Sequence, residues 1–177
     1  MHFSIQSVLE NDQAILEPLT AQDFEVLYAL ASDPKVWEQH PDKDRWKKDQ
    51  FINYFEGAME SKGAFKIIDK ASGEVAGGTR FYEYNPEAKS IAIGYTFYAT
   101  KFWGTGFNPS VKKLMLDYAF QFVDTVIFHI GATNFRSQIA IGRVGAVKVG
   151  EQSIAFNGGA PRLSFIYEIK KGDWEKI

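Results

Sequence analysis

Apolar and polar residues follow two different periods along this chain, and the switch between them predicts both helices and strands. Over residues 20–34 and 49–61 the apolar positions lie three and four residues apart, which is the spacing of one helix face. Thr20 and Asp23 have the spacing of a capping box at the start of the first helix, and Gly63 follows the end of the second. The pattern therefore predicts two helices in the first third of the chain.

The segment between these helices, residues 35–48, mixes charged residues with two tryptophans and has no clean period. It is predicted to be a loop. Trp37 and Trp46 can line a binding pocket there, or they can fold back as lids on the core, and the sequence leaves both interpretations open.

Short runs with the period of a strand flank and follow the helices. Two lie around an Asn11-Asp12 turn, and three more, residues 64–69, 74–84 and 89–99, are separated by turn pairs and predict an antiparallel meander. In the last run, isoleucines and aromatic residues alternate with small or polar ones, which is typical of a strand buried on one face.

The period becomes helical again from Pro109. One stripe of this helix is apolar, and the opposite face is predicted to hold Lys112, Lys113, Asp117 and Gln121. A buried strand over residues 125–132, a short helix over residues 134–145 and a hairpin around Asn157-Gly158-Gly159 complete the pattern. The fold class is therefore α/β or α+β, with one sheet of six to seven strands.

Composition narrows the range of functions that this protein can have. The chain has 177 residues, of which 45% are hydrophobic, and this favours a single domain spanning residues 1–177. A net charge of -2 with no block of like charges argues against nucleic acid and membrane surfaces as partners. The absence of cysteine and the scattered histidines predict no disulfide and no metal site. Because the sequence shows neither a leader pattern nor a long apolar run, the expected location is cytoplasmic.

The stretch Gly104-Thr105-Gly106, followed by Asn108 and Pro109, joins a strand to a helix. The first N–H groups of a helix lack internal partners and attract anions, and glycine lets a ligand approach the backbone. Asn108 is predicted as the N-cap and Pro109 as the first helical residue. A phosphate-bearing ligand fits this turn, although a plain tight turn fits it as well. The triphosphate-binding pattern is absent, and Pro109 stands where the dinucleotide pattern needs its third glycine.

These motifs resemble the GNAT superfamily of acetyl-CoA-dependent N-acetyltransferases, and most of all its Rim-type branch, which acetylates ribosomal-protein N-termini. Residues 101–106 fit the pattern Gln/Arg-x-x-Gly-x-Gly/Ala with lysine in first place. Asn134, Ser137 and Gly145 fit the branch's Asn-x-x-Ser with a later glycine. The resemblance covers nearly the whole chain and implies a mixed, mostly antiparallel sheet flanked by about four helices.

The resemblance also implies a site for acetyl-CoA, with CoA as product. The strand ending near residues 97–99 would splay from the strand at 125–132 and pair with the pantetheine arm. The N–H groups of residues 103–107 would hold the pyrophosphate, and Lys101 would add a cation. The residues that it assigns to the cofactor are Phe97, Tyr98, Ala99, Lys101, Trp103, Gly104, Thr105, Gly106, Phe107, Asn108, Asn134 and Ser137. Ser137 is also the candidate catalytic residue, as proton or hydrogen-bond donor to the departing thiolate. Asn134 and Ser137 can alternatively serve only to cap their helix.

The chain departs from the family pattern at two positions. Ile141 stands where many relatives carry a tyrosine acid, and Ala92 where they often carry a glutamate. The implied function is acetyl transfer by direct attack in a ternary complex, to a peptide or protein N-terminal α-amine or a small-molecule amine, with a homodimer possible. The alternatives are a non-catalytic acyl-CoA-binding or regulatory module and a nucleotide-binding protein. Side chains left as possible bases are Glu83, Glu151, His40 and His129.

Overall fold

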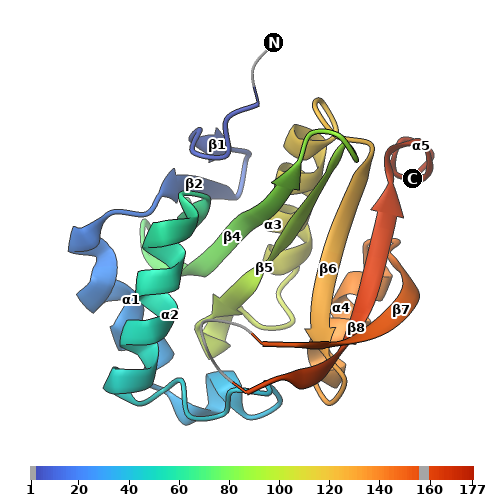
Figure 1. The fold of residues 1–177 in the computed structure, drawn as a ribbon. Helices are drawn as coiled ribbons and strands as arrows, with labels where there is room; N and C mark the ends of the chain where they lie inside the picture. The colour runs from blue at the N-terminus through green and yellow to red at the C-terminus, as the bar shows by residue number, and fades with distance from the viewer. Residues whose placement is uncertain (1–2, 156–159) are drawn as a thin grey trace.

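One mixed sheet organises the computed structural model, which describes residues 3–155 and 160–177. Within these residues eight strands lie in the order β1-β2-β3-β4-β5-β6-β8-β7 (Figure 1). The strands are β1 (Leu9–Glu10), β2 (Ala14–Pro18), β3 (Ala64–Asp69), β4 (Val75–Asn85), β5 (Ser90–Tyr98), β6 (Thr125–Gly131), β7 (Val147–Ile154) and β8 (Arg162–Lys170). Of these described strands, only β5 and β6 pair in parallel. The mixed α/β class is thus confirmed, whereas six to seven strands was wrong, because the two-residue β1 and the β7–β8 hairpin both join the same sheet.

Helices cover both faces of this sheet (Figure 1). They are α1 (Phe24–Ala31), α2 (Lys48–Ser61), α3 (Phe107–Ala119), α4 (Phe135–Arg143) and the single turn α5 (Lys171–Trp174), with short 3-10 turns at Ala21–Asp23, Pro34–Trp37 and Thr100–Phe102. The four longer helices were predicted and α5 was not. Lys62, with φ of 54°, caps α2 in place of the expected Gly63. The predicted turn at residues 157–159 lies outside the described residues.

Two apolar clusters fill the space between the sheet and its helices. The larger one, which includes Phe65, Phe81 and Met115, lies between the sheet and α3. The second includes Leu27, Phe51 and Trp37 and lies under α1 and α2. Trp37 is only 3% exposed and Trp46 packs against the same cluster, so both tryptophans of the predicted loop fold back on the core, and Trp37 also lines a cavity.

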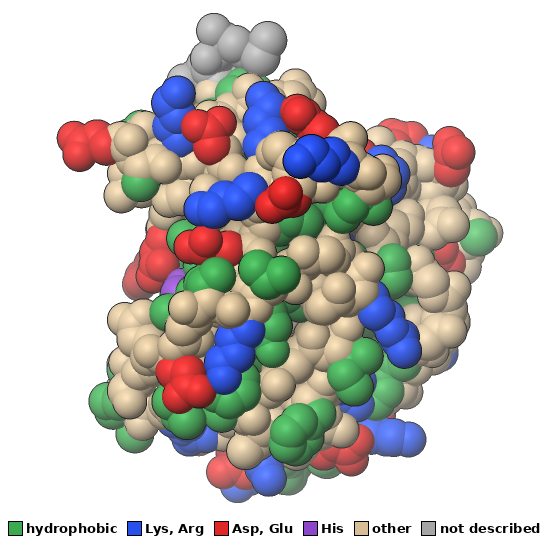
Figure 2. Space-filling view, turned by 90° about the vertical axis from the view of Figure 1, so that its right-hand side faces the viewer, with side chains coloured by type: hydrophobic (Ala, Val, Ile, Leu, Met, Phe, Trp, Pro, Cys, Tyr) green, Lys and Arg blue, Asp and Glu red, His purple; other side chains and the backbone are tan. Residues whose placement is uncertain are grey.

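The sheet ends at β7, whose Val147 and Val149 are exposed. Figure 2 faces this side of the molecule and shows hydrophobic side chains interspersed with charges of both signs. The possible homodimer stays a prediction that sedimentation equilibrium can test. Among the described residues, no helix is both long and apolar enough to span a bilayer.

A buried carboxylate fixes the start of the first helical segment. Asp23 accepts a hydrogen bond from the N–H of Thr20 at 2.8 Å and another from the Lys66 ammonium on β3 at 2.9 Å. Burial is the largest single influence and raises the pKa of Asp23, but the bonds from Lys66 and Thr20 together outweigh it and hold this pKa below its ordinary value. The predicted capping box therefore exists and is tied to the sheet.

Replacing Asp23 by asparagine is expected to lower the free energy of unfolding by about 1–3 kcal/mol at pH 7, because Lys66 loses its buried partner. A carboxyl with a depressed folded-state pKa stabilises the fold above its unfolded pKa, so the difference from wild type should shrink as the pH falls through the folded-state pKa. Urea unfolding at pH 7 and at low pH measures this. Glu25→Gln is the control, since Glu25 is exposed and lies 3.6 Å from the exposed Lys48. An equal loss in both variants would contradict the role of Asp23.

The alternation of residues in β5 predicted a strand that is buried on one face only, and this was wrong. Ile91, Ala92 and Ile93 are each at most 1% exposed, because β5 lies in the middle of the sheet with helices on both sides. Its register against β4 gains one residue between Gly94 and Phe97, and Tyr95 there has φ of 53°. Such a bulge reverses the alternation of side chains beyond it.

Candidate functional site

Strands β5 and β6 separate after a short stretch of pairing. They are in register from Ser90 with Thr125 to Ala92 with Ile127. Beyond these pairs β5 continues to Tyr98 and β6 to Gly131 without pairing to each other. The splay that the family resemblance implied is therefore present, and one edge of β5 lies open.

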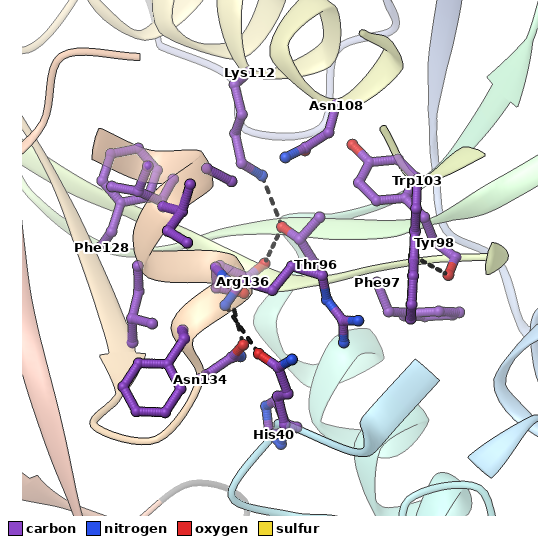
Figure 3. Close-up of a pocket in the computed structure, with 18 of the residues that line it drawn as sticks. His40, Thr96, Phe97, Tyr98, Trp103, Asn108, Lys112, Phe128, Asn134 and Arg136 are labelled. Carbon is purple, nitrogen blue, oxygen red and sulfur yellow. Dashed lines mark hydrogen bonds between the residues drawn. The ribbon is translucent and has the colours of Figure 1, made fainter. Parts of the chain in front are cut away.

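A cavity of about 670 Å³ lies at this splay. Its wall comes from both separated strands, the glycine turn, the starts of α3 and α4, and the loop that carries Trp37 and His40 (Figure 3). Of the residues that the sequence assigned to the cofactor, those in the wall are Phe97, Tyr98, Trp103, Gly104, Gly106, Asn108, Asn134 and Ser137.

The other four assigned residues do not line the cavity. Phe107 is 6% exposed and packs in the larger apolar cluster. The N–H of Ala99 donates to the carbonyl of Ala76 at 2.9 Å, and the Thr105 hydroxyl donates to the carbonyl of Phe102 at 2.8 Å. Lys101 pairs with Glu74 at the surface. These four residues therefore support the structure around the turn and do not form part of the cavity wall.

The glycine turn presents open backbone to the solvent side of the cavity. Gly104 and Gly106 have φ of 70° and 83°, and a Cβ built on either would meet no atom within 4 Å. Among the described residues, no group accepts a hydrogen bond from the N–H groups of Gly104, Thr105 and Gly106. The N–H of Trp103 donates to the carbonyl of Thr100 at 3.0 Å and the N–H of Phe107 to the Thr105 hydroxyl at 3.4 Å, so these two groups of the predicted 103–107 set have partners within the protein. Three free N–H groups before a helix fit a phosphate group.

Helix α3 begins at Phe107, with Gly106 as its N-cap. The prediction of Asn108 as N-cap and Pro109 as first helical residue was wrong, because the left-handed Gly106 starts the helix two residues earlier. The Asn108 side chain instead belongs to the cavity wall. Its Oδ1 and the hydroxyl of Tyr98 are buried without a hydrogen-bond partner in the part of the chain that the structure describes.

The start of α4 closes the opposite wall. Asn134 is the N-cap of this helix, and its Oδ1 accepts the N–H of Ser137 at 3.3 Å. The predicted cap is therefore present, and it holds Ser137 at the cavity. Gln39 accepts the N–H of Arg136 at 3.0 Å, and the Arg136 guanidinium lies 3.7 Å from the centre of the Trp103 ring. The first contact joins α4 to the loop that carries His40, and the second joins it to Trp103 beside the glycine turn.

Lys112 is a cavity residue that the sequence analysis placed on the wrong face. It is only 4% exposed, and its Nζ donates to the Thr96 hydroxyl at 2.8 Å (Figure 3). Burial lowers the pKa of Lys112 to about 7. Its spacing carried a signal: Lys112 lies three residues before the buried Met115 and seven before Ala119, so it continues their stripe.

Two histidines line the same cavity. Burial lowers the pKa of His129. The carboxylate of Glu83, which lies 3.6 Å from the His129 Nε2, raises this pKa by a smaller amount. Burial, with Arg45 and Arg162, lowers the pKa of His40 well below its ordinary value, and the Nδ1 of His40 accepts the N–H of Asp42 at 2.9 Å. Both imidazoles are therefore neutral near pH 7.

Comparison with known proteins finds one matching family and several similar solved structures. A model of the family described as the acetyltransferase (GNAT) domain matches residues 13–147. A GCN5-related N-acetyltransferase from Brucella melitensis is similar at 22% identity and a TM-score of 0.82, over 96% of this chain and 81% of that one. A spermidine N-acetyltransferase from Vibrio cholerae, solved with CoA and spermine, is similar at 18% identity and 0.67, over 93% and 99%. A proposed ribosomal-protein-serine acetyltransferase from Vibrio cholerae is similar at 11% identity and 0.76, over 95% and 99%.

Proposed function

The chain belongs to the acetyltransferase (GNAT) domain family, and on that premise we propose which cavity wall serves each substrate and which amine is acetylated. As a member it is an acetyl-CoA-dependent N-acetyltransferase. Acetyl-CoA and an amine acceptor are its two substrates. The placement of each, the Rim-type branch and a single domain over residues 1–177 are parts of the proposal.

The glycine turn and the open edge of β5 are the proposed site of acetyl-CoA. The free N–H groups of residues 104–106 bind the pyrophosphate at the start of α3. Backbone groups of β5 near Phe97 pair with the pantetheine amides as a further strand would. The free N–H groups of the turn support the first of these contacts, and the edge of β5 that does not pair with β6 supports the second.

Ser137 is the proposed hydrogen-bond donor to the departing sulfur. Asn134 supports this role by holding the first turn of α4 against the cavity through the N–H of Ser137. The chain supplies no tyrosine at the family's acid position, since Ile141 lies there and is 5% exposed. Ser137 and Asn134 serve acetyl transfer by positioning groups and by stabilising the charge that develops during the step.

An N-terminal α-amine is the proposed acceptor, and the charge of the cavity wall is the observation that carries this choice. Among the described residues, no aspartate or glutamate lines the cavity, whereas Lys112, Arg136 and Arg143 do. A wall of this kind disfavours polycations and gives little help in removing a proton from a strong base. An α-amine, with a reference pKa near 7.7 to 8.0, is uncharged about a tenth of the time at pH 7, and a lysine amine about once in 2,500.

A peptide with a free N-terminus and no lysine is therefore expected to be acetylated with a kcat/KM about 100-fold or more above that of an N-terminally blocked peptide with one lysine, at pH 7. Spermidine, a polycation, should behave like the lysine peptide. The advantage should fall to about 20-fold at pH 9, because the α-amine is then already uncharged. Release of CoA thiol measures all three acceptors. Equal turnover of the peptides at pH 7 would contradict the proposed acceptor, and preference for spermidine would assign a polyamine instead.

A further inference from the structure

Lys112 is a buried amine without a carboxylate partner among the described residues. Its Nζ donates to Thr96 Oγ1 at 2.8 Å, and this hydroxyl in turn bonds to the Thr79 hydroxyl at 2.8 Å. Both partners are neutral. Buried lysines in proteins are usually paired with an acid, so an unpaired one in a cavity wall indicates a function other than stability.

The position of Lys112 along α3 matches the reacting end of the acyl donor, and this step rests on the proposed function. Strand β5 runs toward the glycine turn and α3 runs back beside it, because Lys112 on the helix reaches Thr96 on the strand. Lys112 lies six residues after Gly106, which is about 9 Å along the helix axis. With pyrophosphate at Gly106 and pantetheine along β5, the thioester lies further along, toward the bulge that holds Thr96.

A proton donor at this end would assist the reaction. A thiol has a reference pKa near 8.5, and its departure is assisted by an acid whose pKa lies near the working pH. Ile141 supplies no proton, and a serine hydroxyl such as that of Ser137 does not titrate in this range. Figure 3 shows Lys112 pointing from α3 into the cavity beside Asn108, on the far side from His40.

The electrostatic surroundings leave Lys112 able to give up a proton. Burial alone lowers its pKa to about 7, and no charged side chain of the described residues contributes to the shift. Its neighbours on β4, β5 and α3 are the neutral Thr79, Thr96 and Asn108. The remaining titratable side chains in the cavity wall are Tyr95, Tyr98, His40, His129, Arg136 and Arg143.

We propose that Lys112 is a catalytic residue that protonates the departing CoA sulfur. The neutral acceptor amine attacks the thioester carbon, so that a C–N bond forms and the C–S bond breaks with its electron pair on sulfur. The Lys112 ammonium transfers a proton to that sulfur, which gives CoA thiol and a neutral lysine. The acetylated nitrogen releases its extra proton to water, and Lys112 takes one proton back from water before the next cycle.

The test is the pH dependence of kcat in wild type, Lys112→Met, Lys112→Arg and Lys113→Met, with CoA affinity measured for each by calorimetry. Lys112→Met should lower kcat about 100-fold or more, and it should abolish the fall of kcat at high pH. Lys112→Arg keeps the charge but does not titrate in this range, so it should also be slow and lack that fall. Both should bind CoA within a few-fold of wild type. Lys113 is exposed and pairs with Asp117 at 2.6 Å, so its variant should match wild type.

A kcat within about threefold of wild type, with the high-pH fall retained in Lys112→Met, would overturn the inference while normal CoA binding upheld the proposed function. Loss of CoA binding in a cooperatively folded Lys112→Met would also overturn it, by assigning Lys112 to binding. If wild type itself bound no CoA, the proposed function would fail and this inference with it.

Discussion

Replacing Gly106 by valine is expected to lower the affinity for acetyl-CoA by about 100-fold or more. Each charge-assisted hydrogen bond between a phosphate and a backbone N–H contributes about 1.5–3 kcal/mol, and a tenfold change in affinity corresponds to about 1.4 kcal/mol. The Cβ position of Gly106 is open in the structure, so the added side chain would enter the space from which a ligand reaches these N–H groups. Calorimetric titration with acetyl-CoA measures the loss.

Gly73→Val is the matched control for backbone strain. Gly73 has φ of 76°, close to the 83° of Gly106, and its Cβ position is equally open. It lies in the turn between β3 and β4 and does not line the cavity. A β-branched residue in the left-handed region should cost each variant about 1–3 kcal/mol of stability. Wild-type affinity for acetyl-CoA in Gly106→Val would refute the proposed cradle, whereas equal weakening in both variants would show that strain alone is responsible.

Replacing Lys112 by methionine is expected to stabilise the fold, on the order of 4 kcal/mol near pH 6. The native state must hold this amine uncharged or bury its charge, while the unfolded chain keeps it protonated up to about pH 10.4. Because the folded-state pKa is lowered to about 7, the unfolded state binds more protons between pH 7 and 10.4. The stability of wild type relative to the variant should therefore rise across this window and level off below it.

Urea unfolding of both proteins from pH 6 to pH 10 measures this difference, in which the titration of all other groups cancels. Lys113→Met should show no such pH dependence, since Lys113 is exposed. A wild-type-to-Lys112→Met difference that stayed constant with pH would mean that Lys112 titrates alike in both states. A gain in stability together with a loss of kcat would identify Lys112 as a residue kept for function at the expense of stability.

Local sequence signals were sufficient for much of the fold, and together with the family resemblance they indicated much of the cavity wall. Asn134 both caps α4 and faces the cavity, and Gly104 and Gly106 adopt the left-handed backbone that only glycine enters freely. These features depend on residues within one turn of each other. The strand and helix order followed for the same reason, since each period spans only a few residues.

The missed features depend on tertiary packing. Tyr95 takes a positive φ although it is not glycine, and no local pattern predicts the bulge that turns Thr96 toward α3. Lys112 was assigned to solvent because its residue type outweighed its place in the apolar stripe of α3. Asn108 was assigned to a cap because asparagine favours caps, whereas Gly106 starts the helix earlier. His129 and Glu83 come together only because β4 and β6 flank β5.

The most direct test of the central claim is to mix the wild-type protein with acetyl-CoA and a peptide that carries a free N-terminus and no lysine, and to follow CoA thiol and peptide mass together. We expect thiol release and N-terminal acetylation to appear in equal amounts, and to be abolished together in Gly106→Val. Calorimetric binding of acetyl-CoA without acetylation of this peptide, of the lysine peptide or of spermidine would contradict the claim, because the cavity would then hold the acyl donor without transferring its acetyl group.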